Sequence, residues 1–329
     1  MILGATLAGH AQTLLTIEVD NYVPYHIDVS DPATFASKPG ITPAIRPLEF
    51  NRFEFIGDIR SVNGQPAKGI WTATAVGLSL SPTPAPKQAI ADAVRANLIE
   101  MYFDLMQADG TPIGTIMATG LTRGTPPPGA PLVQTGDTLA IVGGTGPFLG
   151  LRGQAGMIDA GSPRQASAVE DPANRRINGG ATRSYVLHLI PMTTPEIVAL
   201  STGPAIVHSS DNSPVTATKP ARAGEVLTLY ATGLGPTRPG LDPGKPFPAT
   251  GVHVVNSPTQ IMVNGTAVPV MFAGGYPGTV NGYQVNFRLP DGTALGLASV
   301  SLNVGWINGS EVKIPVSDDG TPKVTFPIP

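Results

Sequence analysis

The stretch "AIVGGTGPFLGLRG", residues 140–153, leads an apolar segment directly into a cluster of glycines. A phosphate-binding P-loop would place a Lys-Ser/Thr pair after such glycines, and none follows here. A dinucleotide-binding fingerprint would open a helix, but the next stretch, "RGQAGMID" (152–159), carries two glycines that disfavour one. The glycines therefore indicate a tight connection between two β-strands, in which they adopt positive φ or close backbone approach and Phe148 covers the core.

The first half of the chain alternates apolar and polar residues with the period of two that is typical of half-buried strands. Eight segments show this pattern: 13–20, 52–60, 69–80, 98–106, 112–122, 138–144, 150–159 and 183–191. We therefore predict eight strands in this half.

Turn signals between these segments predict antiparallel pairing. Asn63-Gly64 and Asp109-Gly110 are typical of β-hairpins. Eight antiparallel strands can close into a barrel, which removes exposed sheet edges, and a two-sheet sandwich is the alternative. One stretch, 85–98, has helix formers with apolar residues at helical spacing, and we predict a short connecting helix there.

A second set of strands follows a boundary rich in proline and small polar residues near 192–196. The predicted strands are 225–234, 259–275, 282–290, 298–309 and 311–317. Asn264-Gly265 and Asn308-Gly309 are predicted hairpin turns within this set. Frequent turn signals and one apolar face per strand favour an immunoglobulin-like (Ig-like) β-sandwich, so the fold class is all-β with two domains, 12–191 and 192–329.

The composition excludes several function classes. The 329 residues include 39 glycines and 35 prolines but only 13% charged residues, which favours short strands and many turns. A net charge of −3 and the lack of a basic cluster argue against nucleic acid as a partner. There is no cysteine, the five histidines lack metal-ligand spacing, and no Gly-x-Ser-x-Gly elbow occurs, so we expect neither a metal site nor a hydrolase triad.

The N-terminus carries the main indication of location. Residues 1–11, "MILGATLAGHA", are small and apolar and end like the cleavage site of a secretory signal, which predicts a secreted or periplasmic protein. A short disordered or β-forming N-terminus is the alternative. No apolar run approaches the roughly 20 residues needed for a membrane-spanning helix.

The glycine stretch and its neighbours also carry a family resemblance. "AIVGGTGPFLGLRGQAG" resembles the signature of plant dirigent proteins and the allene oxide cyclase superfamily, with Thr145, Phe148, Arg152 and Gly153 at matching positions. "YFDLMQADGTPIGTIMATGLT" resembles that family's hairpin and "RSYVLHLIP" its last strand, so the likeness covers about 90–191. It implies an eight-stranded barrel with an apolar pocket, trimeric assembly, no cofactor, and either steering of phenol coupling or cyclisation of a bound ligand. Pro147 departs from the signature, and the pocket carboxylates of dirigents have no convincing counterpart.

The second half resembles a different family. "ARAGEVLTLYATGLGPT" and "IMVNGTAVPVMFAGGYPGTVNGYQVNFRLP" are similar to an uncharacterised Ig-like domain found at the C-termini of secreted bacterial proteins. The likeness covers about 195–317 and implies export with an accessory, adhesive or spacer role.

Five residues are candidates for catalytic chemistry. Glu54, Tyr102 and Asp104 lie on the polar faces of their strands, which most simply face solvent. If those faces instead line the barrel, the three side chains could act as general acids and bases. Arg152 matches the family signature, although an arginine beneath a glycine turn can simply bond carbonyls. His188 shares a face with Val186 and Ile190, which is more typical of a core histidine than of a catalyst.

These observations predict a barrel that binds a small apolar or phenolic ligand without a cofactor, with cofactor-free cyclisation or stereochemical steering as its chemistry. The alternative is a non-enzymatic extracellular protein with a solid barrel core, in which the Ig-like domain contacts a cell-surface partner.

Overall fold

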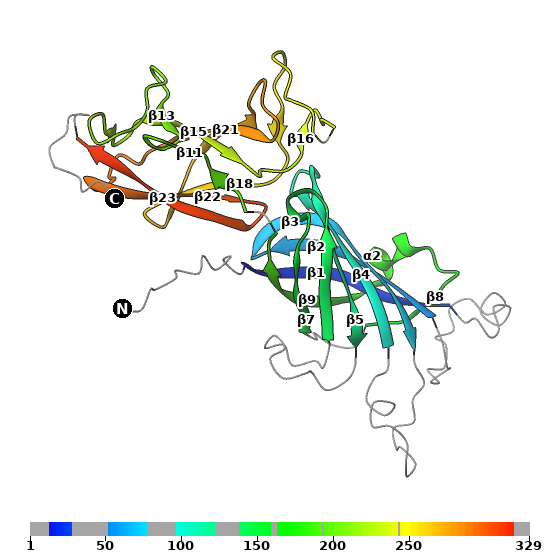
Figure 1. The fold of residues 1–329 in the computed structure, drawn as a ribbon. Helices are drawn as coiled ribbons and strands as arrows, with labels where there is room; N and C mark the ends of the chain where they lie inside the picture. The colour runs from blue at the N-terminus through cyan, green and yellow to red at the C-terminus, as the bar shows by residue number, and fades with distance from the viewer. Residues whose placement is uncertain are drawn as a thin grey trace, which may run out of the picture. The chain divides into compact units, whose positions relative to one another are not determined.

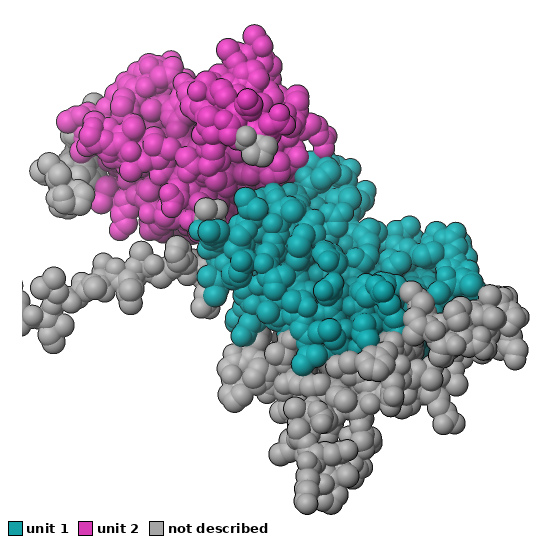
Figure 2. Space-filling view, turned by 45° about the vertical axis from the view of Figure 1, so that its right-hand side comes forward, with its two compact units in different colours: residues 1–192 teal, residues 193–329 magenta. Residues whose placement is uncertain are grey.

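The computed structural model describes residues 13–27, 52–77, 97–122, 138–158, 163–192, 194–242 and 244–318. The chain divides into two compact units, residues 1–192 and 193–329, which are coloured separately in Figure 2. Each unit is described by itself below.

Unit 1 is a closed antiparallel barrel (Figure 1). Its eight strands are β1 (Thr13–Ile27), β2 (Arg52–Val62), β3 (Gln65–Gly77), β4 (Asn97–Gln107), β5 (Pro112–Thr122), β6 (Thr138–Gly144), β7 (Arg152–Ile158) and β9 (Ala181–Ile190). Each strand pairs with its neighbour, and β1 closes the barrel by pairing with both β2 and β9. The eight predicted strands and the barrel are confirmed, and the closure excludes a sandwich for this half.

The alternation along each strand separates the inside of the barrel from the outside. On β4, Ile99, Met101, Phe103 and Leu105 are buried, while the residues between them are exposed. Because directly paired residues of antiparallel strands share a face, the register then assigns the faces of the neighbouring strands. Ile116 of β5, for example, pairs with Phe103 and lies inside.

The predicted turns of unit 1 form as the sequence indicates. Asn63 and Gly64 both have positive φ, 50° and 73°, which is the two-residue hairpin geometry between β2 and β3. Gly110, with φ 91°, lies in the turn between β4 and β5. The helix predicted over 85–98 is wrong at its end, because Asn97 and Leu98 pair with β3 and β5 as the start of β4, and the rest of that prediction lies outside the described residues.

The glycine stretch forms the connection between β6 and β7 and contains a short 3-10 helix, η2 (Gly146–Phe148). Gly146 and Gly150 have φ of 63° and 74°, in the left-handed region that favours glycine. A Cβ on Gly146 would collide with the backbone carbonyl of Ile113. Phe148 is fully buried at 0% exposure, so the connection closes this end of the core as predicted.

A β-bulge in β1 changes which residues face the inside of the barrel. The pairing with β2 shifts between Asp20 and Val23, where Asn21 adopts a φ of 52°. Beyond the bulge, Tyr22 contacts rings inside the barrel, whereas Val23 and Tyr25 join a small outer cluster.

That outer cluster lies beneath the segment 163–180, which covers part of the barrel's outer surface. The segment contains β8 (Ala166–Ser167), η3 (Pro172–Asn174) and the one-turn helix α2 (Arg175–Asn178). β8 pairs in parallel with β1, and Ala166 packs with Val23, Tyr25 and Ile56.

Unit 2 contains two larger sheets around a common core. One sheet contains β10 (Glu196–Ile197), β15 (Val226–Thr232), β21 (Gly282–Arg288), β20 (Val270–Gly275), β17 (Val254–Val255) and β16 (Thr237–Arg238), with β13 (Ile206–His208) also paired to β15; the other contains β14 (Ala221–Arg222), β23 (Ile307–Ser317), β22 (Gly296–Val304), β18 (Thr259–Val263) and β19 (Thr266–Val268). A small hairpin joins β11 (Ala199–Leu200) to β12 (Gly203–Pro204). Leu229 and Phe287 from the first sheet share one hydrophobic cluster with Ile261, Val300 and Ile314 from the second.

One of the two predicted turns in unit 2 is displaced. Asn264-Gly265 forms the β18–β19 turn as predicted, with φ of 49° and 78°. The turn between β22 and β23 lies instead at Gly305 and Trp306, with φ of 56° and 64°. This register pairs Val304 with Ile307, which buries both apolar side chains, so Asn308 and Gly309 continue the strand.

Candidate functional site

The five predicted site residues all lie on the outer face of the barrel. Tyr102 is 41% exposed, and Asp104, Arg152 and His188 are also exposed. The expectation that His188 is a core histidine is wrong, because its register partner is Leu14, whose side chain also faces outward.

Two of these five residues have clear structural contacts. Glu54 accepts a hydrogen bond of 2.7 Å from the Thr74 hydroxyl and pairs with Arg52 at 3.4 Å. Arg152 donates from Nη1 to the carbonyls of Val142 (2.7 Å) and Leu151 (2.9 Å), which holds the glycine connection to its own strands. Neither residue faces the inside of the barrel, so we assign neither to catalysis.

The inside of the barrel instead carries a continuous group of aromatic rings, which we call the lumen cluster. Its members come from β1, β2, β3, β4 and β9, each on the inner face of its strand. They are Tyr22, His26, Phe53, Phe55, Trp71, Phe103 and Tyr185.

The rings of the lumen cluster pack in edge-to-face, stacked and tilted pairs. Trp71 is central: its ring centroid is 5.3 Å from that of Tyr22 and 5.2 Å from that of Tyr185. His26, at the far end, meets Phe53 edge-on at 4.5 Å. Such pairs stabilise a core beyond the apolar area that they bury.

Several polar atoms within the lumen cluster are buried without a hydrogen-bond partner. Trp71 is 1% exposed, and its indole Nε1 has no partner in the described part of the chain. The same holds for both ring nitrogens of His26, which is 4% exposed. Burial lowers the pKa of His26, and the nearby Gln165 side chain offsets part of this effect. The His26 ring is therefore neutral near pH 7 and carries one N–H donor and one acceptor nitrogen.

A guanidinium group also belongs to this interior. Arg183 lies two residues before Tyr185 on the same face of β9, and its Cζ is 3.8 Å from the centroid of the Tyr22 ring. Its Nη1 donates to the Met157 sulfur at 2.8 Å, whereas its Nε is buried without a partner among the described residues. Within the same part of the chain, no carboxylate pairs with Arg183.

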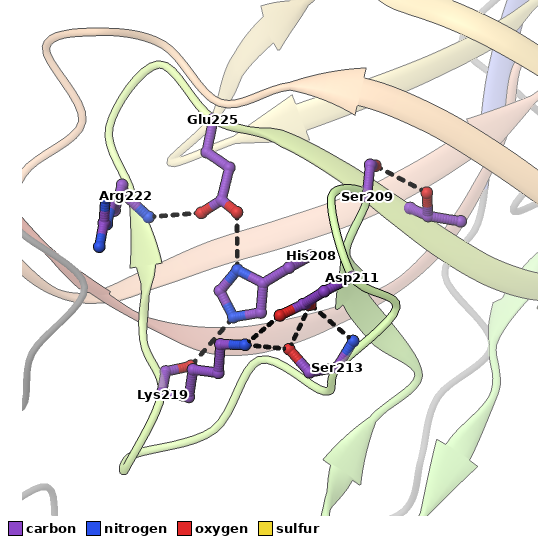
Figure 3. A network of polar contacts seen from close by, with 8 residues as sticks. His208, Ser209, Asp211, Ser213, Lys219, Arg222 and Glu225 are labelled. Carbon is purple, nitrogen blue, oxygen red and sulfur yellow. Dashed lines mark hydrogen bonds and ion pairs between the residues drawn. The ribbon is translucent and has the colours of Figure 1, made fainter.

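A second polar arrangement lies in unit 2 and is shown in Figure 3. It lines a depression of about 380 Å³ between the loop after β13 and the segment before β15. Buried His208 lies 2.6 Å through Nδ1 from Glu225 and 3.2 Å through Nε2 from the Lys219 carbonyl. Glu225 also accepts a bond of 2.9 Å from the backbone N–H of Arg222.

The polar side chains around this depression bond to one another. Lys219 Nζ lies 2.5 Å from Asp211 and 2.6 Å from Ser213 (Figure 3). Hydrogen bonds from Lys219 and Ser213 hold the pKa of Asp211 far below its usual range. Both acidic groups and both histidine nitrogens thus have partners, which is typical of a network that fixes a loop.

Sequence reasoning missed the lumen cluster because it searched the polar faces of the strands. The aromatic residues that would have indicated it lie on the opposite faces of the strands. Phe53 and Phe55 alternate with Glu54, and Trp71 lies at an inward-facing position of the next strand. The lumen cluster and Arg183 include no carboxylate, so a search for carboxylate acid–base groups does not find them.

Fold and interior together define an all-β protein whose first unit is a closed eight-stranded barrel with an aromatic interior. No protein-family model matches the chain, and a search of curated proteins finds no relative. In the described ranges, no helix is long and apolar enough to cross a membrane, and no three His, Asp or Glu side chains gather as metal ligands would.

Proposed function

We propose that the barrel binds a small planar aromatic ligand against the lumen cluster. The observation that carries this proposal is the presence of unpartnered polar atoms, Trp71 Nε1 and the His26 ring nitrogens, inside a wall of aromatic rings. Buried polar groups normally have a hydrogen-bond partner, and leaving one unpaired costs about 1–3 kcal/mol. An aromatic ligand with a polar substituent would stack on the rings and supply the missing partner.

The same proposal extends to the kind of protein. A closed eight-stranded antiparallel barrel supports the relation to the allene oxide cyclase and dirigent barrels, and two sheets around one core support an Ig-like second domain. A ligand held in one conformation would have its reaction steered by orientation alone, without a cofactor. The secreted location remains a prediction from residues 1–11, which lie outside the described residues.

A second candidate is a structural protein whose barrel core is solid. The observation in its favour is the close packing of the same rings: Trp71, Phe103 and Tyr185 are each at or below 1% exposure, with neighbouring centroids about 5 Å apart. On this reading the rings fill the barrel, and the unpaired nitrogens are a cost of that packing.

Side-chain NMR separates the two candidates, because the protein has two tryptophans, one in each unit. In ¹⁵N-labelled full-length protein, titration with neutral 2-naphthol should shift the indole N–H signal of Trp71 and leave that of Trp306 unchanged. The variant Trp306→Phe assigns the two signals. A Trp71 signal that stays fixed at millimolar 2-naphthol would reject ligand binding and favour the solid barrel.

A further inference from the structure

We propose that the ligand of the barrel is an aromatic carboxylate and that Arg183 binds its carboxylate group. This inference rests on the proposed function, since it names the chemical class that the lumen cluster would accept. It is carried by Arg183 and by the donor at Trp71.

The position of Arg183 is unusual for a charged residue. It projects from the inner face of β9 into the aromatic interior, and its Nε has no contact with solvent or with an acceptor of the described residues. The Arg183 side chain as a whole is only partly buried, but a buried N–H donor such as its Nε is costly when it lacks an acceptor, because it has lost the hydrogen bond that it would make with water. The Tyr22 ring and the Met157 sulfur, which is a weak acceptor, compensate this cost only in part.

The orientation of the guanidinium leaves it able to take an anion. A guanidinium that stacks on a ring uses its flat face, so its N–H groups point sideways in the plane. Nη1 is directed at Met157, and the Nε edge is the part that lacks an acceptor. A carboxylate binds such an edge through two parallel N–H···O bonds.

The surroundings of Arg183 select the rest of the ligand. The Tyr22 ring lies under the guanidinium, and Trp71 contacts both Tyr22 and Tyr185. The Trp71 indole adds a second N–H donor, which is suited to an acceptor group on the ligand. Rings and donors together fit a flat aromatic acid, whereas a cationic ligand would be repelled by Arg183.

The test compares two probes of nearly the same shape, the anionic 2-naphthoate and the neutral 2-naphthamide, by calorimetric titration of the full chain. Hydrogen bonds to charged groups are roughly twice as strong as neutral ones, so wild type should bind naphthoate about tenfold more tightly than naphthamide. Arg183→Gln should abolish this preference while retaining naphthamide binding. Arg60→Gln, which changes an exposed arginine paired with Glu18 on the outer face, should keep it.

The outcomes separate this inference from the proposed function. Equal binding of the two probes by wild type would overturn the aromatic carboxylate and leave aromatic binding intact. Binding of neither probe would remove the proposed function itself. If Arg183→Gln does not fold, the comparison of the two probes in wild type still tests the aromatic carboxylate, and the Trp71 indole signal shows whether naphthoate binds in unit 1. Arg183→Lys keeps the charge but loses the two-point bond, and it should give an intermediate preference for naphthoate.

Discussion

The carboxylate of Asp58 on β2 lies 2.6 Å from the guanidinium of Arg175 on α2, which is 117 positions later in the chain. The Arg175 side chain is nearly fully buried, and its Nη1 also donates to the Pro172 carbonyl at 2.7 Å. Arg176 and Asn21 donate to the same carboxylate. One acidic group therefore fastens the segment 163–180 to the outer surface of the barrel.

Replacing Asp58 with asparagine should destabilise unit 1 substantially. The change would leave the buried Arg175 guanidinium without its counter-charge, and breaking a buried ion pair in this way costs about 3 kcal/mol. Urea unfolding followed by Trp71 emission in a Trp306→Phe background measures the effect. The matched control is Asp104→Asn, an exposed carboxylate of the same barrel, which should change the free energy of unfolding by less than about 0.5 kcal/mol. Equal effects of the two variants would show that Asp58 does not hold the segment.

Unit 1 should lose stability in acid through the same contacts. Burial by itself raises the pKa of Asp58, but hydrogen bonds from Arg176, Asn21 and Arg175 outweigh it and hold the pKa below its usual range. The hydrogen bond from Arg164 likewise lowers the pKa of Glu170. Because the folded pKa values lie below the unfolded ones of about 4, this stabilisation is complete above pH 4 and is lost as the pH falls through the folded values. Unfolding free energies measured between pH 6 and pH 2 should fall in wild type and fall less in Asp58→Asn.

The strands of the barrel could be predicted because each carries a local signal. Alternation fixes the buried face of a segment such as β4, and Asn-Gly pairs fix the hairpins. The bulge in β1 carries no such signal. Strict alternation from Val19 would place Val23 and Tyr25 inside and leave Tyr22 and His26 outside, whereas the extra residue at the bulge reverses these faces.

The lumen cluster and the ion pair between Asp58 and Arg175 could not be predicted for a related reason. Trp71 and Tyr185 are far apart in the sequence and meet only because the barrel closes. Arg175 meets Asp58 only because β8 pairs with the far end of β1. Such contacts depend on closure and on the register beyond the bulge, which are properties of the whole sheet.

Two glycines of the stretch 140–153, Gly146 in the connection and Gly143 near the end of β6, should respond differently to the same substitution. Gly146→Ala would force a left-handed backbone on alanine and place a Cβ against the Ile113 carbonyl, which should cost about 1–3 kcal/mol. Gly143→Ala meets nothing within 4 Å and should have little effect, so it is the matched control. Urea unfolding of both variants, read from Trp71, checks the difference, and a stable Gly146→Ala would contradict the geometric role of the glycines.

The buried histidine should add a pH dependence of its own nearer neutrality. Burial lowers the pKa of His26, so its folded value lies below the unfolded value of about 6.5. The contribution of His26 to the free energy of unfolding is therefore fully present above pH 6.5. It is lost as the pH falls through the folded pKa, because the unfolded chain binds the proton more readily. In His26→Phe, where a ring still packs on Phe53 but cannot be protonated, the unfolding free energy should stay level between pH 7 and pH 5. The same change at His188, whose ring faces solvent, should keep the wild-type slope, and a slope that survives in His26→Phe would place its origin in another residue.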